Sequence, residues 1–180
     1  MHRRPMIEAL GVYETSDSTE AEMLRRTKEF VSSNAQCFER TLSTGHITGS
    51  AWIVSADRRH ALLTHHRKLD MWVQLGGHSD GDPDTCSVAT REALEESGLQ
   101  SIVLISPDIF DVDVHRIPER GAEPAHFHYD IRYLFQAAHD EPFVVSEESL
   151  ALAWVEMESL VELGVDQSVL RMAAKTTGAV

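Results

Sequence analysis

The chain has 180 residues, which is the length of one domain or of one domain with a terminal extension. Hydrophobic residues make up 42% of it, enough for a core, and no apolar run approaches the ~20 residues of a membrane-spanning helix. The formal net charge of −13, from 29 acidic and 16 basic residues, disfavours nucleic acid as a partner because it repels a phosphate backbone. A small anionic substrate is still allowed, since a bound divalent cation can reverse the local potential.

The basic residues at the start are not followed by the apolar stretch of a signal peptide, so we expect a cytoplasmic protein. Cys37 and Cys86 are far apart and form no CxxC pair, which argues against a disulfide framework or a zinc knuckle. We expect them to be two buried thiols.

Residues 1–44 are predicted to form a helical appendage to a main domain over 45–180. Asp17 and Glu20 have the spacing of a capping box at a helix start. Apolar residues then recur on one face as far as Leu42, and the polar triplet Ser32-Ser33-Asn34 allows a break into two helices, with Asn34 capping the second. None of the side chains in this appendage is a candidate for a catalytic role.

From residue 46 onward, short apolar and alternating segments predict a β-sheet. One helix is well marked, with Asp82 as its N-cap, Pro83 at its first position and Gly98 at its end. Further helical sequence begins at Glu158, and the mixture indicates a single α+β domain. The predicted strands cover residues 47–56, 61–66, 72–75, 102–115, 126–135 and 151–155.

Three carboxylates lie close together on the predicted central helix. Glu92, Glu95 and Glu96 have i, i+3 and i+4 spacing, so they project from one face. Two unit charges ~4 Å apart repel by about 4 kcal/mol at an effective dielectric near 20. A solvated acidic face is the ordinary interpretation, but apolar neighbours, Arg91 and a glycine-rich loop before the helix favour a site for a hard cation.

The stretch from Gly76 to Leu99 resembles the Nudix box. The box is a glycine, five residues, a glutamate, seven residues, then Arg-Glu, an aliphatic residue, any residue, Glu-Glu, any residue, a glycine and an aliphatic residue. With Arg91 as the box arginine, Gly77 is the box glycine. The later fixed positions are filled by Glu92, Ala93, Glu95, Glu96, Gly98 and Leu99.

The resemblance, over residues 47–160, implies the Nudix fold, a mixed β-sheet sandwiched between helices (α/β/α). It also implies a Mg²⁺- or Mn²⁺-dependent hydrolase, in which water attacks one phosphorus of a nucleoside diphosphate linked to another group. It implies that Arg91 orients the carboxylates and that a backbone oxygen near Gly76 completes the metal shell. The implied metal ligands are Glu92, Glu95 and Glu96.

Pro83 departs from the box, because it stands where the first box glutamate should be. In the family, that glutamate mainly supports the loop and the box arginine. Asp84 lies two helical turns before Arg91 on the same face, so we expect Asp84 to support Arg91 in its place, with Asp80 and Asp82 as further candidates.

Histidines alternate with aromatic residues along the predicted strand 126–135, so His126, His128 and Arg132 share one face. We expect His126 and His128 to face the same cleft as the box carboxylates, and the preceding strand to pair with this one as a hairpin. Two interpretations stay open. The face is either a polar surface open to water, or the lining of the substrate cleft, where it binds phosphate through His⁺ or Arg132 or a second metal through imidazole. His78, next to the box, and the pair His65-His66 are candidates to join this face.

Two further residues are candidates outside the box. Glu147 precedes the last strand and is a candidate base, metal ligand or reader of the nucleobase, although a solvated turn explains it equally well. Trp72 is a candidate for stacking on a nucleobase, although a tryptophan in a strand is more often a core residue.

The sequence leaves three functions open: a hydrolase of ADP-ribose or nucleotide-sugar type, a catalytically weak Nudix ligand-binding or regulatory module, and an isopentenyl diphosphate isomerase-like enzyme. The complete carboxylate set argues against a pure binding module. An isomerase needs a cysteine in the cleft, where neither Cys37 nor Cys86 is expected. We expect a small nucleotide-type molecule as the partner, and no membrane or nucleic acid; a homodimer stays open.

Overall fold

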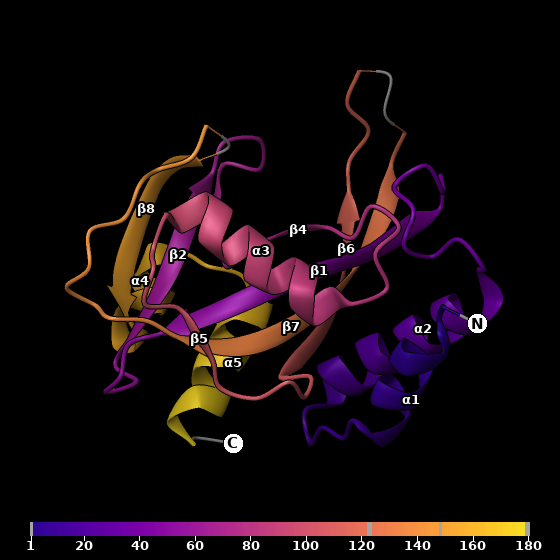
Figure 1. The fold of residues 1–180 in the computed structure, drawn as a ribbon, viewed down its shortest axis with the longest axis horizontal. Coiled ribbons are helices and arrows are strands. Elements are labelled where there is room, and N and C mark those ends of the chain that lie inside the picture. The colour runs from indigo at the N-terminus through magenta and orange to yellow at the C-terminus, as the bar shows by residue number, and fades with distance from the viewer. Residues whose placement is uncertain (1, 122–123, 148, 179–180) are drawn as a thin grey trace.

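The computed structural model describes residues 2–121, 124–147 and 149–178. Its central feature is one mixed β-sheet of eight strands (Figure 1). The strand order is β3-β2-β1-β7-β5, with β4 paired to β1, β6 to β7 and β8 to β2. The elements are α1 (Arg4–Val12), α2 (Ser18–Ser33), β1 (Gly45–Val54), β2 (His60–His66), β3 (Met71–Val73), β4 (Leu75–His78), α3 (Thr85–Ser97), β5 (Val103–Leu104), β6 (Asp111–Ile117), β7 (His126–Gln136), β8 (Ser149–Glu156), the 3₁₀ turn η1 (Met157–Ser159), α4 (Leu160–Leu163) and α5 (Gln167–Thr177).

The central strand β1 is buried along its whole length and pairs on both sides. It is antiparallel to β2 and β4 and parallel to β7. In the parallel pair, His46 is opposite His128, and the register continues two residues further on with Thr48 opposite Asp130. Side chains paired in this way point to the same face of the sheet.

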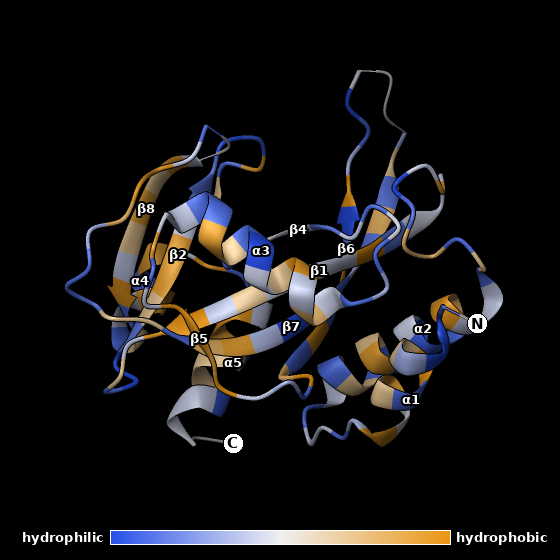
Figure 2. Cartoon of the chain, viewed as in Figure 1, coloured by the Kyte–Doolittle hydropathy of each residue, from blue (hydrophilic) through white to orange (hydrophobic). Residues whose placement is uncertain are grey.

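Helices cover both faces of the sheet. Ile47 of β1 belongs to a buried cluster with Ala89 of α3, whereas Trp52 belongs to a second cluster with Met172 of α5. Because these two β1 residues differ by an odd number, α3 and α5 lie on opposite faces (Figure 1). Along α3 itself, hydrophobic and hydrophilic residues alternate from turn to turn (Figure 2). The predicted α+β class and the layered arrangement are confirmed.

The contact between β1 and α3 depends on a glycine. A Cβ atom at Gly49 would lie 2.5 Å from the carbonyl oxygen of Thr85 and 3.1 Å from the side chain of Val88. Only a residue without a side chain therefore allows α3 to approach the central strand this closely.

The N-terminal region differs from its prediction in two ways. It contains α1, which the sequence did not indicate, and α2 ends at its cap residue Asn34, at the break that the polar triplet allowed, with turns and no second helix over 35–44. Asp17 caps α2 as expected by accepting a hydrogen bond from the backbone N–H of Glu20. Leu10 of α1 and other apolar residues of both helices pack into the same cluster as β1 and α3. Among the described residues, no helix has the length and apolarity to cross a membrane.

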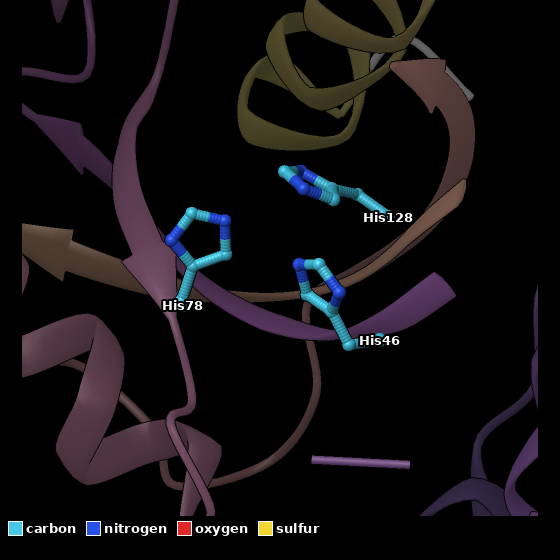
Figure 3. Close-up of side chains that lie close together, drawn as sticks. All are labelled: His46, His78 and His128. Atoms are coloured by element: carbon cyan, nitrogen blue, oxygen red, sulfur yellow. The ribbon is translucent and has the colours of Figure 1, made fainter. Parts of the chain in front are cut away.

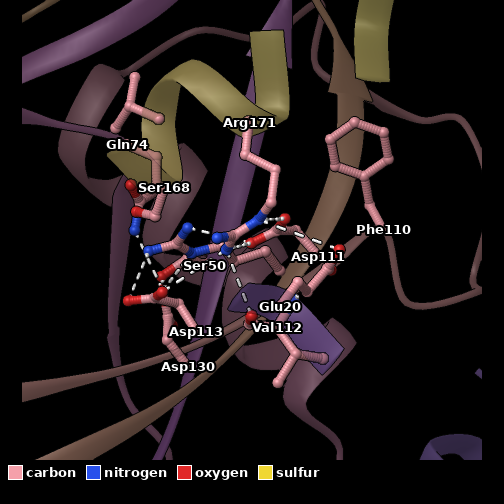
Figure 4. A network of polar contacts seen from close by, with 12 residues as sticks. Glu20, Ser50, Gln74, Phe110, Asp111, Val112, Asp113, Asp130, Ser168 and Arg171 are labelled. Atoms are coloured by element: carbon pink, nitrogen blue, oxygen red, sulfur yellow. Dashed lines mark hydrogen bonds and ion pairs between the residues drawn. The ribbon is translucent and has the colours of Figure 1, made fainter. Parts of the chain in front are cut away.

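A buried network of charges joins β6, β7 and α5 (Figure 4). Asp111, which is fully buried, accepts hydrogen bonds from Arg132 Nη1 at 3.1 Å, Arg171 Nε at 2.8 Å and Lys175 Nζ at 2.9 Å. Burial alone would raise the pKa of Asp111, but the hydrogen bonds from Arg171 and the charges of Arg132 and Lys175 hold it below its usual value. The carboxylate therefore stays ionised in the core.

Glu20 extends this network to the N-terminal region. Its Oε1 accepts hydrogen bonds from Lys175 Nζ at 2.6 Å and from the backbone N–H of Val112 at 3.1 Å. The Glu20 side chain is fully buried, so it does not reach back to Asp17 as a capping box requires. It connects α2 to β6 and α5 instead.

We expect Asp111→Asn to lower the free energy of unfolding by about 3–5 kcal/mol, because it leaves Arg132 and Arg171 buried with too little negative charge. Urea denaturation followed by circular dichroism measures the change. Glu8→Gln is the matched control, since it breaks the surface pair with Arg4 and should change stability by no more than about 1 kcal/mol.

A loss below about 1 kcal/mol for Asp111→Asn would contradict the structural role of the network. The lowered pKa adds a second check. A carboxyl group whose pKa is lower in the folded state stabilises the fold above its unfolded-state pKa, and this contribution disappears as the pH falls through the folded-state value. The difference in stability between the wild type and Asp111→Asn should therefore shrink in acid.

Candidate functional site

Glu92 of α3 lies directly against the backbone of β4. A Cβ atom at Gly77 would be 2.5 Å from Glu92 Cδ and 2.6 Å from its Oε2, so the glycine provides the space that the carboxylate fills. Arg91 Nη2 donates hydrogen bonds to Glu92 Oε1 at 2.9 Å and to the carbonyl oxygen of His78 at 3.3 Å. These contacts join the end of β4 to the middle of α3 through a charged pair.

The three box glutamates differ in exposure. The side chain of Glu92 is 19% exposed and Glu96 is 8% exposed, whereas Glu95 is exposed to solvent. Glu92 and Glu96 are one helical turn apart, so both approach the β4 side of the helix. Among the described residues, one carboxylate oxygen from each of the three glutamates cannot be chosen so that all three lie within 4.8 Å of one another. The three carboxylates are therefore near each other but do not converge on one point.

A hard divalent cation fits this donor set. Carboxylate and carbonyl oxygens are the ligands that Mg²⁺ and Mn²⁺ prefer. Glu92 and Glu96 offer such oxygens from adjacent turns of α3. Gly77 leaves room beside them that any other residue would occupy.

Helix α3 begins two residues later than the sequence indicated. Its N-cap is Asp84, not Asp82, and the Asp84 carboxylate accepts a hydrogen bond from the backbone N–H of Ser87 at 3.0 Å. Asp82 instead accepts from the backbone N–H of Asp84 at 2.9 Å, and Pro83 lies in the turn before the helix. The predicted support of Arg91 by Asp84 is therefore wrong, because the Asp84 carboxylate is occupied at the cap.

Asp84→Ala should lower the free energy of unfolding by about 1 kcal/mol, because α3 loses its N-cap acceptor. Pro83→Ala is the control and should have a smaller effect, since Pro83 makes no cap contact. Thermal and urea unfolding of both variants test this. If the two variants are equally stable, the cap does not determine where α3 begins.

The predicted hairpin of β6 and β7 is present, with His115 opposite His128. However, the expected orientation of His126 and His128 toward the box carboxylates is wrong. His128 is paired with His46 of β1, whose neighbour Ile47 packs on the α3 side. The histidines therefore leave the sheet on the face of α5, opposite to α3. Sequence alternation grouped them correctly but did not show which helix covers their face.

Five histidine side chains gather on this face at the end of β1, β4, β6 and β7. Those of His46, His78 and His128 converge, with one ring nitrogen of each within 4.8 Å of the others (Figure 3). His46 is 1% exposed, and neither of its ring nitrogens has a hydrogen-bond partner among the described residues. His126 lies beside His128, with 3.3 Å between their Nε2 atoms. The fifth member, His115, lies against His128 with 5.4 Å between the ring centres.

Two of these imidazoles, His46 and His128, are held in the neutral form. Burial, together with the neighbouring His78 and His126, lowers the pKa of His46 to about 4. Burial and the nearby His115 and His46 also lower the pKa of His128 well below its usual value. Binding of phosphate by a protonated His128 is therefore not supported, and a neutral imidazole is the form that binds metals.

The sequence pointed to only part of this cluster. His46 was not recognised because it stands alone at the start of a buried strand and gives no local signal. Its alternation with Thr48 and its pairing with His128 depend on a parallel contact between distant segments. His78 was noted only for its position next to the box.

The remaining predicted site residues have other surroundings. Arg132 is 2% exposed and its guanidinium is surrounded by Asp111, Asp113 and Asp130, so it is not available to a substrate. Trp72 stacks on the ring of His65 at 5.1 Å and packs against the buried cluster on the α5 side.

Glu147 is exposed, and its backbone carbonyl accepts a hydrogen bond from Arg67 Nε at 3.0 Å. Its role as a base or ligand stays a prediction.

No family model and no curated protein matches the sequence. Many solved structures are similar to the chain. A dihydroneopterin triphosphate pyrophosphohydrolase from E. coli is 16% identical with a TM-score of 0.60, over 74% of this chain and 96% of that one. A C. elegans Ap4A hydrolase is 17% identical with a TM-score of 0.59, over 74% and 96%. A NUDIX family hydrolase from Clostridium perfringens is 22% identical with a TM-score of 0.55, over 75% and 98%.

At these identities the similarity concerns the fold. It covers nearly the whole of each of the three proteins. The chain therefore has the fold of the Nudix hydrolases, as its sequence predicted.

Proposed function

We propose that the chain is a divalent-metal-dependent hydrolase that cleaves the pyrophosphate bond of a small nucleotide-type metabolite. The observation that carries the proposal is the position of the Glu92 carboxylate, which fills the space left by Gly77 and is paired with Arg91. Like charges at i, i+3 and i+4 destabilise a helix unless a cation lies among them. The Nudix fold of the chain supports the same conclusion.

The residues of α3 and β4 have separate tasks in this proposal. Glu92, Glu95 and Glu96 would hold the cation; Glu92 and Glu96 are the more buried of the three, and Glu95 is exposed. Arg91 fixes the Glu92 carboxylate and, through the carbonyl of His78, the end of β4. When bound, Mg²⁺ or Mn²⁺ would neutralise the diphosphate and lower the pKa of the attacking water. The backbone at Gly76 stays a candidate to complete the shell.

We propose a nucleoside diphosphate linked to another group, such as ADP-ribose or a nucleotide sugar, as the substrate class. Two of the similar structures are named for the hydrolysis of Ap4A and of dihydroneopterin triphosphate, both of which contain phosphoanhydride bonds. The charge of −13 is compatible with a small substrate that arrives with its cation, and it disfavours nucleic acid. The structure of the single chain gives no support for a homodimer.

The isomerase-like alternative needs a reactive cysteine, and neither cysteine suits this role. Burial raises the pKa of Cys37 to about 11, and burial also raises the pKa of Cys86. Reactive thiols instead have lowered pKa values. Cys37 is buried as expected, whereas Cys86 is only half-buried, and its raised pKa is what argues against a reactive role. The binding-module alternative differs from the proposal in a measurable way, since it retains ligand binding without turnover.

Glu96→Gln should lower turnover at least ~100-fold, which corresponds to about 2.7 kcal/mol of barrier, because a neutral amide is a poorer ligand for a hard cation. Activity is measured as product release by mass spectrometry in a screen of diphosphate-linked metabolites with Mg²⁺ or Mn²⁺. Glu162→Gln, an exposed glutamate of α4, is the matched control and should retain full activity.

Two outcomes would contradict this mechanism: activity that survives complete chelation of divalent cations, and a Glu96→Gln variant with a rate near that of the wild type. A wild-type protein that binds a metabolite tightly but never turns it over would favour the binding module.

Gly77→Ala should reduce turnover while changing the free energy of unfolding little. The added Cβ would lie 2.5–2.8 Å from three atoms of the Glu92 carboxylate, so that carboxylate has to move. The end of a flexible side chain can do so at small cost to the fold, but its position relative to Arg91 is lost. Steady-state rates and urea unfolding separate the two effects.

Gly11→Ala is the control, because a Cβ atom there meets nothing within 4 Å. It should preserve the rate and slightly stabilise α1, since alanine is the better helix former. Unchanged turnover in Gly77→Ala would show that the position of Glu92 on β4 does not matter for the reaction.

A further inference from the structure

We propose that His46, His78 and His128 bind a transition-metal ion at a site separate from the box carboxylates. Each residue comes from a different strand, namely β1, β4 and β7, and one ring nitrogen of each lies within 4.8 Å of the others. Figure 3 shows the three rings turned toward a common space. A tetrahedral ion with bonds of 2.0–2.1 Å to nitrogen needs ligand separations of about 3.3 Å, which small rotations of these rings would reach.

The surroundings of His46 are the strongest argument that this cluster binds a metal ion. It is 1% exposed, and both of its ring nitrogens are buried without a hydrogen-bond partner among the described residues. A buried polar group without a partner is unfavourable, and native proteins rarely keep one without a reason. A metal ion on one nitrogen of His46 would satisfy that atom and explain why an imidazole occupies a core position.

The surroundings also fix the strands that carry the three ligands. One carboxylate, Asp130, accepts hydrogen bonds from Thr48 Oγ1 at 2.8 Å and from Gln74 Nε2 at 3.0 Å. Thr48 is two residues after His46, Gln74 is four residues before His78, and Asp130 itself is two residues after His128. Asp130 of β7 therefore contacts β1 and the residue directly before β4, close in sequence to all three ligands, which preorganises the proposed site.

His126 lies next to the position that a fourth ligand would take. Its Nδ1 is 2.9 Å from the carbonyl oxygen of Pro124, which accepts a hydrogen only if that nitrogen carries the proton. The lone pair is then on Nε2, which is 3.3 Å from Nε2 of His128. This distance equals the separation expected for two ligands of one tetrahedral ion. We therefore assign His46, His78 and His128 as three ligands, and the fourth position is taken by His126 or by water.

The ligand type distinguishes this site from the box. Imidazole nitrogen suits Zn²⁺, Co²⁺ and other transition metals, whereas Mg²⁺ prefers oxygen. The two sites also lie on opposite faces of β4, because Gly77 contacts Glu92 on the α3 side and His78 follows it on the α5 side. Loading of the histidines should therefore be independent of Glu96, and the inference does not rest on the proposed hydrolase activity.

The experiment is a titration of the full-length, chelator-treated protein with Co²⁺ in the presence of excess Mg²⁺. We expect one equivalent of Co²⁺ to bind and to produce the visible d–d absorption of a nitrogen-coordinated ion, and one equivalent of Zn²⁺ to displace it. Metal content is checked by mass spectrometry after dialysis. Zn²⁺ loading should also raise the melting temperature, because the ion would join three strands.

Variants test the assignment of ligands. His78→Ala and His128→Ala should each lower Zn²⁺ affinity at least ~100-fold, since even loss of a residue that only orients a ligand costs 10–100-fold. His139→Ala is the matched control, because its ring lies against His60 at 4.4 Å, away from the cluster, and it should load normally. Glu96→Gln should also load normally, and circular dichroism verifies that each variant is folded.

A wild-type protein that binds no Co²⁺ or Zn²⁺ under these conditions would overturn the proposal. Full loading of folded His78→Ala and His128→Ala would do so as well, and so would loss of loading in Glu96→Gln, which would assign the ion to the box. Loss of hydrolase activity with normal Co²⁺ loading would instead concern the proposed function alone.

Discussion

The guanidinium of Arg132 is almost completely buried between carboxylates, and much of the architecture depends on how its charge is balanced. Arg132 Nε donates to Asp130 at 2.8 Å and its Nη1 donates to Asp111 at 3.1 Å. Asp111 in turn binds Arg171 and Lys175 of α5, and Lys175 reaches Glu20 of α2. A buried ion is tolerated only if its partners are in place, so the sheet, α5 and α2 must assemble together for this group to be stable in the core.

The same carboxylates determine the geometry of the histidine face. Asp130 accepts hydrogen bonds from Thr48 of β1 and from Gln74, directly before β4, as well as from Arg132. Asp113 contacts both Arg132 and the ring of His115. The polar face of the sheet therefore contains two zones that follow one another along β7. In the first zone histidine rings converge, and in the second each guanidinium is paired with carboxylates. The carboxylates of the second zone are therefore already engaged, whereas the imidazoles of the first offer nitrogen ligands for a cation.

The sequence predicted those parts that depend on local spacing. The row of Glu92 and Glu96 on one helical face, the hairpin of β6 and β7, and the Nudix fold all follow from motifs within short segments. The sequence could not predict α1, the burial of Glu20, or the participation of His46 in the histidine cluster, because each depends on contacts between distant segments. The shift of the α3 cap from Asp82 to Asp84 has a local cause, since Asp82 already accepts a hydrogen bond within the turn that precedes the helix.

The strand β7 shows why alternation alone cannot assign function. His128 and Arg132 share a face, and the alternation along the strand does not distinguish them, yet His128 lies in a cluster of histidine rings and Arg132 in an ion network. The two residues differ in their partners on the neighbouring strand β1. His46 is paired with His128, whereas Ser50 is paired with Arg132 and donates a hydrogen bond from its hydroxyl to Asp130. Because β1 and β7 are parallel and far apart in sequence, this pairing is set only when the whole sheet forms.

The position of Glu92 on the other side of β4 also depends on the formation of the sheet. Gly77 lies against Glu92 only when β4 is paired with β1. The box carboxylates and the histidine cluster therefore both form when β1, β4 and β7 pair. They lie on opposite faces of the sheet because successive residues of a strand point to opposite faces.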